Sequence, residues 1–148
     1  MEINYTIGLL KSNTVKIFIG LLTCLVIFTQ CKDEQLKMNY TYVDQNNNRY
    51  SINHLTIDYR PIKASESSSG TYDGGEEKKV SITEEEYSEI TSIAEDFLSN
   101  KELENQKREM LTAILYSIDQ HENKRKVILR SSEKRTLLEK ILKEALKK

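Results

Sequence analysis

The fold is decided by the stretch Met110-Leu-Thr-Ala-Ile-Leu-Tyr-Ser-Ile-Asp-Gln-His-Glu-Asn-Lys-Arg-Lys-Val-Ile-Leu-Arg130. Its first half fits two patterns. Met110, Leu111, Ile114, Leu115 and Ile118 recur at helical spacing, whereas Met110, Thr112, Ile114, Tyr116 and Ile118 alternate as on one side of a strand. Residues 119–123 are typical of a turn, and residues 126–130 are typical of a strand. Because a partner strand directly before the turn is the economical arrangement, we predict a β-hairpin.

Upstream of this stretch, short alternating segments predict further strands. In Met38–Val43, the side chains of Met38, Tyr40 and Tyr42 fall on one face, as in a half-buried strand. An Asp/Asn-rich turn follows at 44–48, and residues 49–52 and 55–62 read as two more strands. Pro61 marks the end or an edge of the last of these.

Two amphipathic helices complete the pattern. Thr83 and Glu86 have the spacing of a capping box, which predicts a helix from Thr83 to about Asn100. Its apolar stripe consists of Tyr87, Ile90, Ile93, Ala94, Phe97 and Leu98. Ser131 or Ser132 caps a second helix at the end of the chain. The apolar residues of that helix are Leu137, Leu138, Ile141, Leu142, Ala145 and Leu146.

The expected order is therefore strands, helix, β-hairpin and helix. Strands with one apolar face and helices with one apolar stripe bury these surfaces against each other. We predict a small two-layer α+β domain over residues 38–148, in which an antiparallel sheet packs on two helices.

A Ser/Gly-rich loop at 64–79 separates the strands from the first helix. Its composition is that of adaptable binding loops, in which tyrosine is flanked by serine and glycine, and a disordered connector is the alternative. The candidate binding residues are Ser68, Ser69, Gly70, Tyr72, Asp73, Gly74 and Gly75. No Gly-Lys-Ser/Thr follows them, so the loop lacks the pattern of a phosphate-binding loop.

The sequence contains little that indicates catalysis or a cofactor. His54 and His121 are the only histidines, and neither has the spacing of a zinc site or of a serine-hydrolase triad. We expect no metal and no cofactor. Residues 101–148 carry 13 basic and 8 acidic side chains, but the aromatic residues of single-strand binders are missing among them, and we expect no nucleic-acid partner.

The N-terminus has the layout of a secretory signal. Lys11 and Lys16 precede a run of 13 apolar or small residues at 17–29, and Gln30-Cys31 is followed by Lys32-Asp33-Glu34. As a helix the run would span about 20 Å, whereas the hydrocarbon core of a bilayer is about 30 Å thick. A cleaved signal peptide over residues 1–30 is therefore favoured over a permanent transmembrane helix.

The junction at Cys31 resembles that of bacterial lipoprotein precursors. It departs from their usual pattern at Phe28 and Gln30. The resemblance implies cleavage before Cys31 and attachment of acyl chains to its sulfur, with residues 31–37 as the lipidated cysteine and tether. Two acyl chains anchor a protein stably, whereas one holds it only marginally. Lys32-Asp33-Glu34 is similar to the export signal of flavobacterial-type lipoproteins, which implies the outer membrane, on its surface or its periplasmic face.

These observations lead us to expect a membrane-anchored envelope lipoprotein that acts as a non-enzymatic binding module for an envelope protein or glycan. A structural or stress-related envelope lipoprotein is the first alternative, and a small enzyme is the second.

Overall fold

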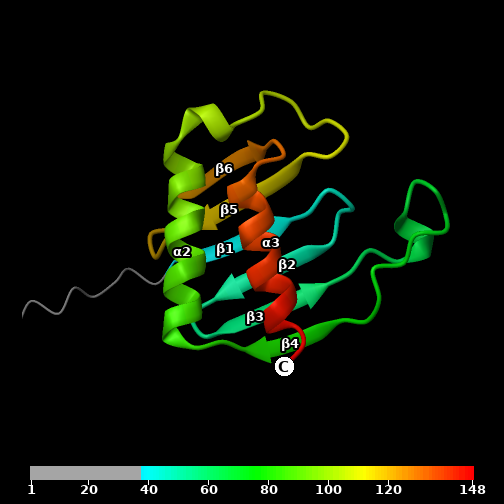
Figure 1. Cartoon of the computed structure of the whole chain (residues 1–148), viewed down its shortest axis with the longest axis horizontal. Coiled ribbons are helices and arrows are strands. Elements are labelled where there is room, and N and C mark those ends of the chain that lie inside the picture. Colours follow the sequence, from blue (N-terminus) through cyan, green and yellow to red (C-terminus); the bar gives the residue numbers. More distant parts are fainter. Residues whose placement is uncertain (1–37) are drawn as a thin grey trace, which may run out of the picture. The chain divides into compact units, whose positions relative to one another are not determined.

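The computed structural model describes residues 38–148, so the predicted signal peptide, Cys31 and the tether lie outside the described residues. Six antiparallel strands form one sheet in the order β4-β3-β2-β1-β5-β6 (Figure 1). These strands are β1 (Asn39–Val43), β2 (Arg49–Asn53), β3 (Thr56–Arg60), β4 (Lys78–Ser81), β5 (Ala113–Ile118) and β6 (Lys124–Leu129). The helices are α2 (Glu84–Ser99) and α3 (Glu133–Ala145), with the short 3-10 turns η1 (Ala64–Glu66) and η2 (Lys101–Leu103).

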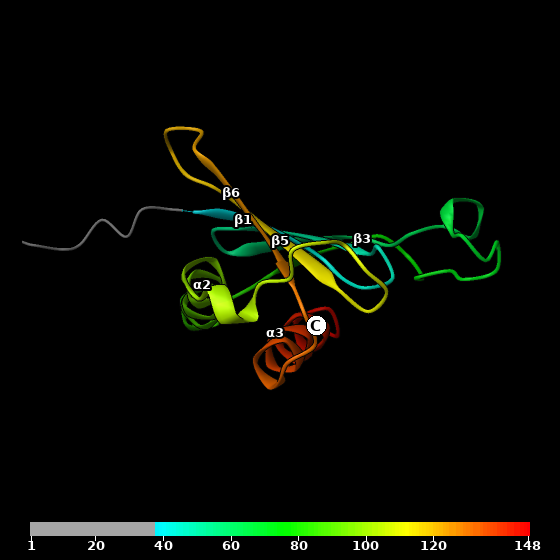
Figure 2. The same ribbon diagram turned by 90° about the horizontal axis from the view of Figure 1, so that it is seen from above.

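Both α-helices lie on the same face of the sheet, which confirms the predicted two-layer α+β class (Figure 2). The predicted alternation in β1 is also confirmed, because Tyr40 and Tyr42 are buried under the helices. The core between the two layers includes Ile52 and Ile57 from the sheet, Ile90 and Phe97 from α2, and Leu138 and Leu142 from α3. Within residues 38–148, no helix is both long and apolar enough to cross a membrane.

Residues 110–130 form the predicted β-hairpin, but its first strand is shorter than the alternation from Met110 to Ile118 indicates. β5 begins at Ala113 and pairs with β6 from Ala113↔Leu129 to Ile118↔Lys124. Met110 is 91% exposed, and Leu111 has a φ of 67°, which an extended strand does not allow. The core face of β5 carries Leu115 and Ser117, and the opposite face carries Tyr116.

The predicted C-terminal boundary of the loop at 64–79 is wrong, because β4 begins at Lys78. Lys78 and Lys79 pair with Tyr59 and Asp58 of β3, so β4 forms an edge of the sheet. Charged side chains, lysine above all, protect edge strands from further pairing. Because β4 is rich in lysine and shows no alternation of apolar and polar residues, the sequence pattern did not predict a strand there.

Both helix caps are as predicted. The Thr83 hydroxyl accepts a hydrogen bond from the Glu86 amide, and the Glu86 carboxylate accepts one from the Thr83 amide. Ser132, not Ser131, caps α3, and its hydroxyl accepts from the Arg135 amide. Leu137 departs from the predicted apolar stripe of α3, because 45% of its surface is exposed.

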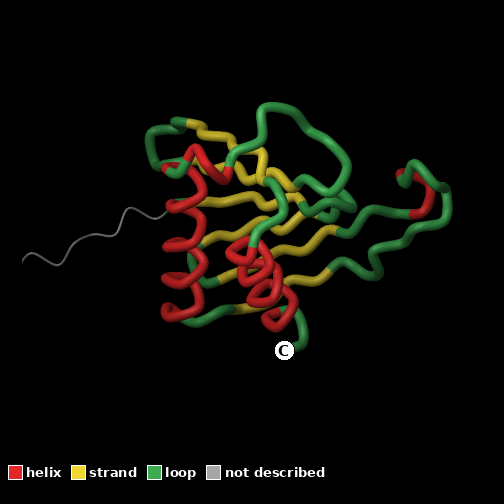
Figure 3. Tube along the Cα trace, turned by 45° about the horizontal axis from the view of Figure 1, so that its top comes forward, coloured by secondary structure: helices red, strands yellow, loops and turns green. Residues whose placement is uncertain are grey.

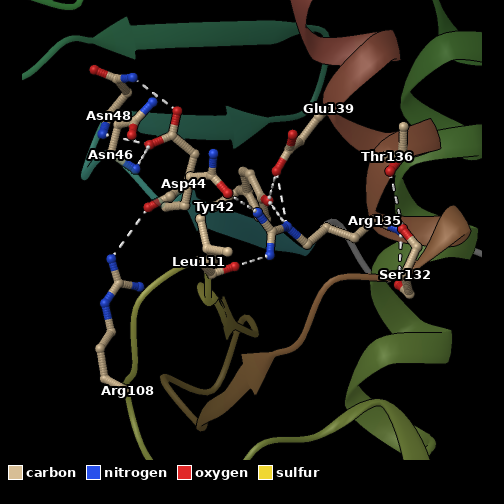
Figure 4. A network of polar contacts seen from close by, with 11 residues as sticks. Tyr42, Asp44, Asn46, Asn48, Arg108, Leu111, Ser132, Arg135, Thr136 and Glu139 are labelled. Carbon is tan, nitrogen blue, oxygen red and sulfur yellow. Dashed lines mark hydrogen bonds and ion pairs between the residues drawn. The ribbon is translucent and has the colours of Figure 1, made fainter.

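One charged side chain is buried between the layers. Arg135 of α3 is 4% exposed and donates hydrogen bonds to the Tyr42 hydroxyl, the Glu139 carboxylate and the Leu111 carbonyl (Figure 4). It also donates to the Gln45 side chain at 3.0 Å. Burial alone would lower the pKa of its guanidinium, but the contacts with Glu139 and Tyr42 outweigh burial and raise that pKa. Arg135 therefore joins α3 to β1, to the β1–β2 turn and to the segment before β5.

We predict that Arg135→Leu lowers the free energy of unfolding by about 3 kcal/mol, because it leaves the buried partners of the guanidinium without their donor. Lys140→Ala is the matched control, since its ion pair with Glu144 is long, at 4.0 Å, and exposed, and its loss costs less than about 0.5 kcal/mol. Urea denaturation of both variants measures the difference. Equal stabilities of the two variants would contradict the role given to Arg135.

Candidate functional site

The candidate site is a cavity of about 410 Å³ at one end of the domain. Its wall is made by the β1–β2 turn, the core-facing tyrosines of β2 and β3, the second half of the Ser/Gly-rich loop, and the end of α3. The aromatic and amide residues in this wall are Tyr50, Tyr59, Tyr72, Asn46 and Asn48. The charged residues are Asp44, Glu76, Lys78 and Lys143. The volume is within the range of small-ligand sites.

The β1–β2 turn is held by one carboxylate. Asp44 accepts hydrogen bonds from the backbone amides of Asn46 and Asn48 at 2.8 and 2.9 Å, and from the Asn48 side-chain amide at 2.8 Å. From the segment before β5, Arg108 donates to the Asp44 carbonyl (Figure 4). It also donates to the Asn47 side chain at 2.6 Å. The turn residues that line the cavity are therefore fixed before any ligand arrives.

The Ser/Gly-rich loop divides into two parts. Its first part extends beyond the end of the sheet (Figure 3), and Ser68, Ser69 and Gly70 do not line the cavity. Its second part returns along the domain, and Tyr72, Gly74 and Gly75 do line it. Of the predicted binding residues, the structure thus brings these three together.

Asp73 acts within the loop, where its carboxylate accepts a hydrogen bond from the Gly75 amide at 2.8 Å. This contact stabilises the bend at Gly75, whose φ of 96° favours glycine. Asp73 thus shapes the loop and does not line the cavity.

Tyr72 is held by its hydroxyl, not by its ring. The hydroxyl accepts hydrogen bonds from the side-chain amides of Asn48 at 2.9 Å and Asn46 at 3.4 Å. The residue nevertheless keeps 36% of its surface exposed. An exposed aromatic ring with a fixed orientation is well suited to contact a ligand, because little side-chain freedom is lost on binding.

Gly74 anchors the loop to the sheet. Its amide donates to the Ile62 carbonyl at 3.1 Å, and its carbonyl accepts from the Tyr59 hydroxyl at 2.8 Å. A β-carbon at this position would lie 2.2 Å from the Asn48 side-chain oxygen and 2.8 Å from the Pro61 side chain. Only glycine therefore allows the loop to pass this close to the β1–β2 turn.

Several wall residues were not predicted from the sequence, among them Asn46, Asn48 and Tyr59. Tyr50 is another. It is 4% exposed, and its ring packs on that of Tyr59 with centroids 4.9 Å apart. Within residues 38–148 its hydroxyl makes no hydrogen bond, whereas the hydroxyls of Tyr40, Tyr42 and Tyr59 each bond a carboxylate or carbonyl. Burial, followed by the negative charge of Asp44, raises the pKa of Tyr50, so its hydroxyl stays protonated and can donate.

The histidines lie apart from this cavity. His54 contacts Glu84 at 3.1 Å and meets the Tyr87 ring edge-on, and His121 lies in the β5–β6 turn. In the described part of the chain, no three His, Cys, Asp or Glu side chains come together as metal ligands. The expected absence of a metal and of a cofactor stays a prediction.

No protein-family model, curated protein or solved structure matches this chain.

We predict that Gly74→Ala releases the loop from the sheet, because the added methyl group overlaps Asn48 and Pro61. The backbone amides of residues 74 and 75 should then exchange with solvent at least about 10-fold faster, as their hydrogen bonds open more often. Hydrogen exchange by NMR measures this. Ser68→Ala, in the part of the loop outside the cavity, should leave both rates unchanged. Unchanged rates in Gly74→Ala would show that the close packing is not needed.

Proposed function

We propose that this chain is a lipid-anchored binding module of the bacterial envelope, without catalytic activity, which holds its partner in the tyrosine-lined cavity. The anchor is a set of acyl chains on Cys31, and the membrane is the outer membrane. The cavity residues that touch the partner are Tyr50 and Tyr72.

Tyr50 is the observation that carries this proposal. The Tyr50 side chain is 4% exposed, but its hydroxyl is not an enclosed group left without a partner: among the described residues, the enclosed side-chain oxygens without a hydrogen bond are those of Thr91 and Ser117. The Tyr50 hydroxyl lacks a partner within the described residues and lines the cavity, where a bound group can supply the missing bond. A ligand group that replaces water at this hydroxyl would gain a hydrogen bond that phenylalanine at position 50 could not make, worth about 0.5–1.5 kcal/mol.

The cavity residues also favour binding over catalysis. The Asp44 carboxylate already accepts three hydrogen bonds that shape its own turn, so it is poorly placed to accept a proton from a substrate. Tyr50 and Tyr59 have raised pKa values because they are buried, which makes their phenolates unavailable as bases at neutral pH. Fixed rings, amides and protonated hydroxyls are the groups by which a binding site orients its ligand.

The placement at a membrane is supported by the sequence of the leader. An apolar run too short to span the bilayer ends at residue 29, Gln30 and Cys31 come next, and the charged residues Lys32-Asp33-Glu34 follow. Acyl chains at this point leave the 38–148 domain in water, attached through a short tether. A tethered domain of this kind meets envelope components at high effective concentration.

We predict that Tyr72→Ala lowers the retention of envelope material at least about 10-fold, because an exposed, fixed aromatic ring is the type of residue that dominates binding energy. Liposomes that carry the protein extracted from membranes would be incubated with an envelope extract from a strain without the protein, then sedimented. Tyr116→Ala, on the sheet face opposite the helices, is the matched control and should retain as much as wild type. The proposal is wrong if wild type retains nothing, or if both variants retain equal amounts.

We predict that the membrane-extracted protein starts at Cys31 and carries the added mass of acyl chains. Cys31→Ala should lose that added mass, and Cys24→Ala, which alters only the discarded leader, should keep it. Intact-mass spectrometry of the three proteins measures this. A wild-type mass equal to that of the uncleaved, unmodified chain would disprove the anchor while leaving the binding site untouched.

A further inference from the structure

We infer that the ligand group held in the tyrosine-lined cavity is a neutral carbohydrate ring. This inference rests on the proposed function, since it names the chemical class of ligand for the same cavity. It follows from the charge balance of the wall, the exposed aromatic surface and the free hydrogen-bonding groups.

The charges in the wall cancel. Lys78 and Lys143 are basic, Asp44 and Glu76 are acidic, and none of these four pairs with another across the cavity within 4.0 Å. A ligand with a net charge of either sign would be attracted by two of these groups and repelled by the other two, so it gains little net attraction to offset the loss of its hydration. A neutral ligand has no such hydration to lose.

Hydroxyl groups match the polar groups that remain available. A hydroxyl is both donor and acceptor, so it can bond an ammonium through its oxygen and a carboxylate through its hydrogen. The Lys143 ammonium and the Glu76 carboxylate take part in no hydrogen bond or ion pair within residues 38–148, and the Tyr50 hydroxyl is also free there. A molecule with several hydroxyls can therefore bond all three groups at once.

The aromatic surface favours a sugar ring over an open-chain polyol. The face of an aromatic ring carries partial negative charge, and the carbon-bound hydrogens on the flat side of a sugar ring are weakly positive. Tyr72 offers an exposed ring whose hydroxyl is fixed by Asn48. The tilted pair Tyr50 and Tyr59 forms part of the wall deeper in the domain.

A quaternary ammonium is the nearest alternative ligand, because tyrosines together with carboxylates form the usual cage for it. Two lysines in the same wall make such a cage unfavourable for a cation. A zwitterion such as phosphocholine could match both signs of charge, but it has no N–H or O–H donor for the Glu76 carboxylate and no ring to stack on Tyr72. The test must therefore separate a neutral sugar from phosphocholine.

The experiment uses tyrosine fluorescence and isothermal titration calorimetry on the full-length chain. The protein has no tryptophan and eight tyrosines, so its emission reports directly on tyrosine environments. A polyoxyethylene detergent is required, because sugar-headed and phosphocholine-headed detergents are themselves probes. The ligands are maltose, cellobiose, lactose, N,N′-diacetylchitobiose, phosphocholine and inorganic phosphate.

The expected result is saturable binding of at least one of the four disaccharides, and neither phosphocholine nor phosphate should bind. Tyr72→Ala should weaken disaccharide binding at least about 10-fold. Tyr50→Phe removes one hydrogen bond and keeps the ring, so about 5-fold weaker binding is expected. Tyr116→Phe should bind as wild type does, and far-ultraviolet circular dichroism checks that every variant is folded.

The carbohydrate inference is overturned if none of the four disaccharides binds, or if phosphocholine binds in their place. If envelope material is still retained by liposomes in a Tyr72-dependent way, the proposed binding function survives that failure and only the ligand class is wrong. If no envelope material is retained either, the proposed function fails with it. Disaccharide binding that Tyr72→Ala and Tyr50→Phe leave unchanged would place the sugar elsewhere and also overturns the inference.

Discussion

The buried guanidinium of Arg135 is the interaction on which the arrangement of this domain depends. A charge between two layers is costly unless every donor has a partner, and Arg135 has partners on β1, on the β1–β2 turn and on the segment before β5. The same helix carries Glu139 and Lys143 at successive four-residue steps from Arg135. Thus the contact that places α3 on the sheet also places Lys143 at the cavity, and it holds the turn from which Asn48 reaches Tyr72.

The sequence was sufficient for the architecture because most elements carry their own local signals. Thr83 and Glu86 form the capping box that marks the start of α2, and Tyr40 and Tyr42 alternate toward the core as a half-buried strand requires. The hairpin was found because residues 126–130 are typical of a strand, and most of them do lie in β6. The exact start of β5 could not be predicted from the sequence. Leu111 has a positive φ, and its carbonyl is held by Arg135, which is distant in the sequence.

The cavity was only partly predictable, for a physical reason. Composition pointed to the Ser/Gly-rich loop, but composition does not tell which half of a loop returns to the domain. That half is selected by Gly74, which alone allows close packing on Asn48, and by the lysine-rich edge strand β4, which has no apolar pattern to detect. Tyr50 resembled any other core-facing strand residue. Its distinction is a hydroxyl without a partner among the described residues, and that appears only once the neighbouring side chains are placed.

Whether the tyrosine-lined cavity binds a neutral sugar is tested by an NMR titration of the full-length chain with ring-labelled tyrosine, using the neutral disaccharides as ligands. The signals of Tyr50, Tyr59 and Tyr72 should shift together and saturably, because these rings share one cavity, while the signal of Tyr116 on the opposite face should stay in place. Shifts confined to Tyr116, or no shift in the three cavity tyrosines, would contradict sugar binding in the cavity.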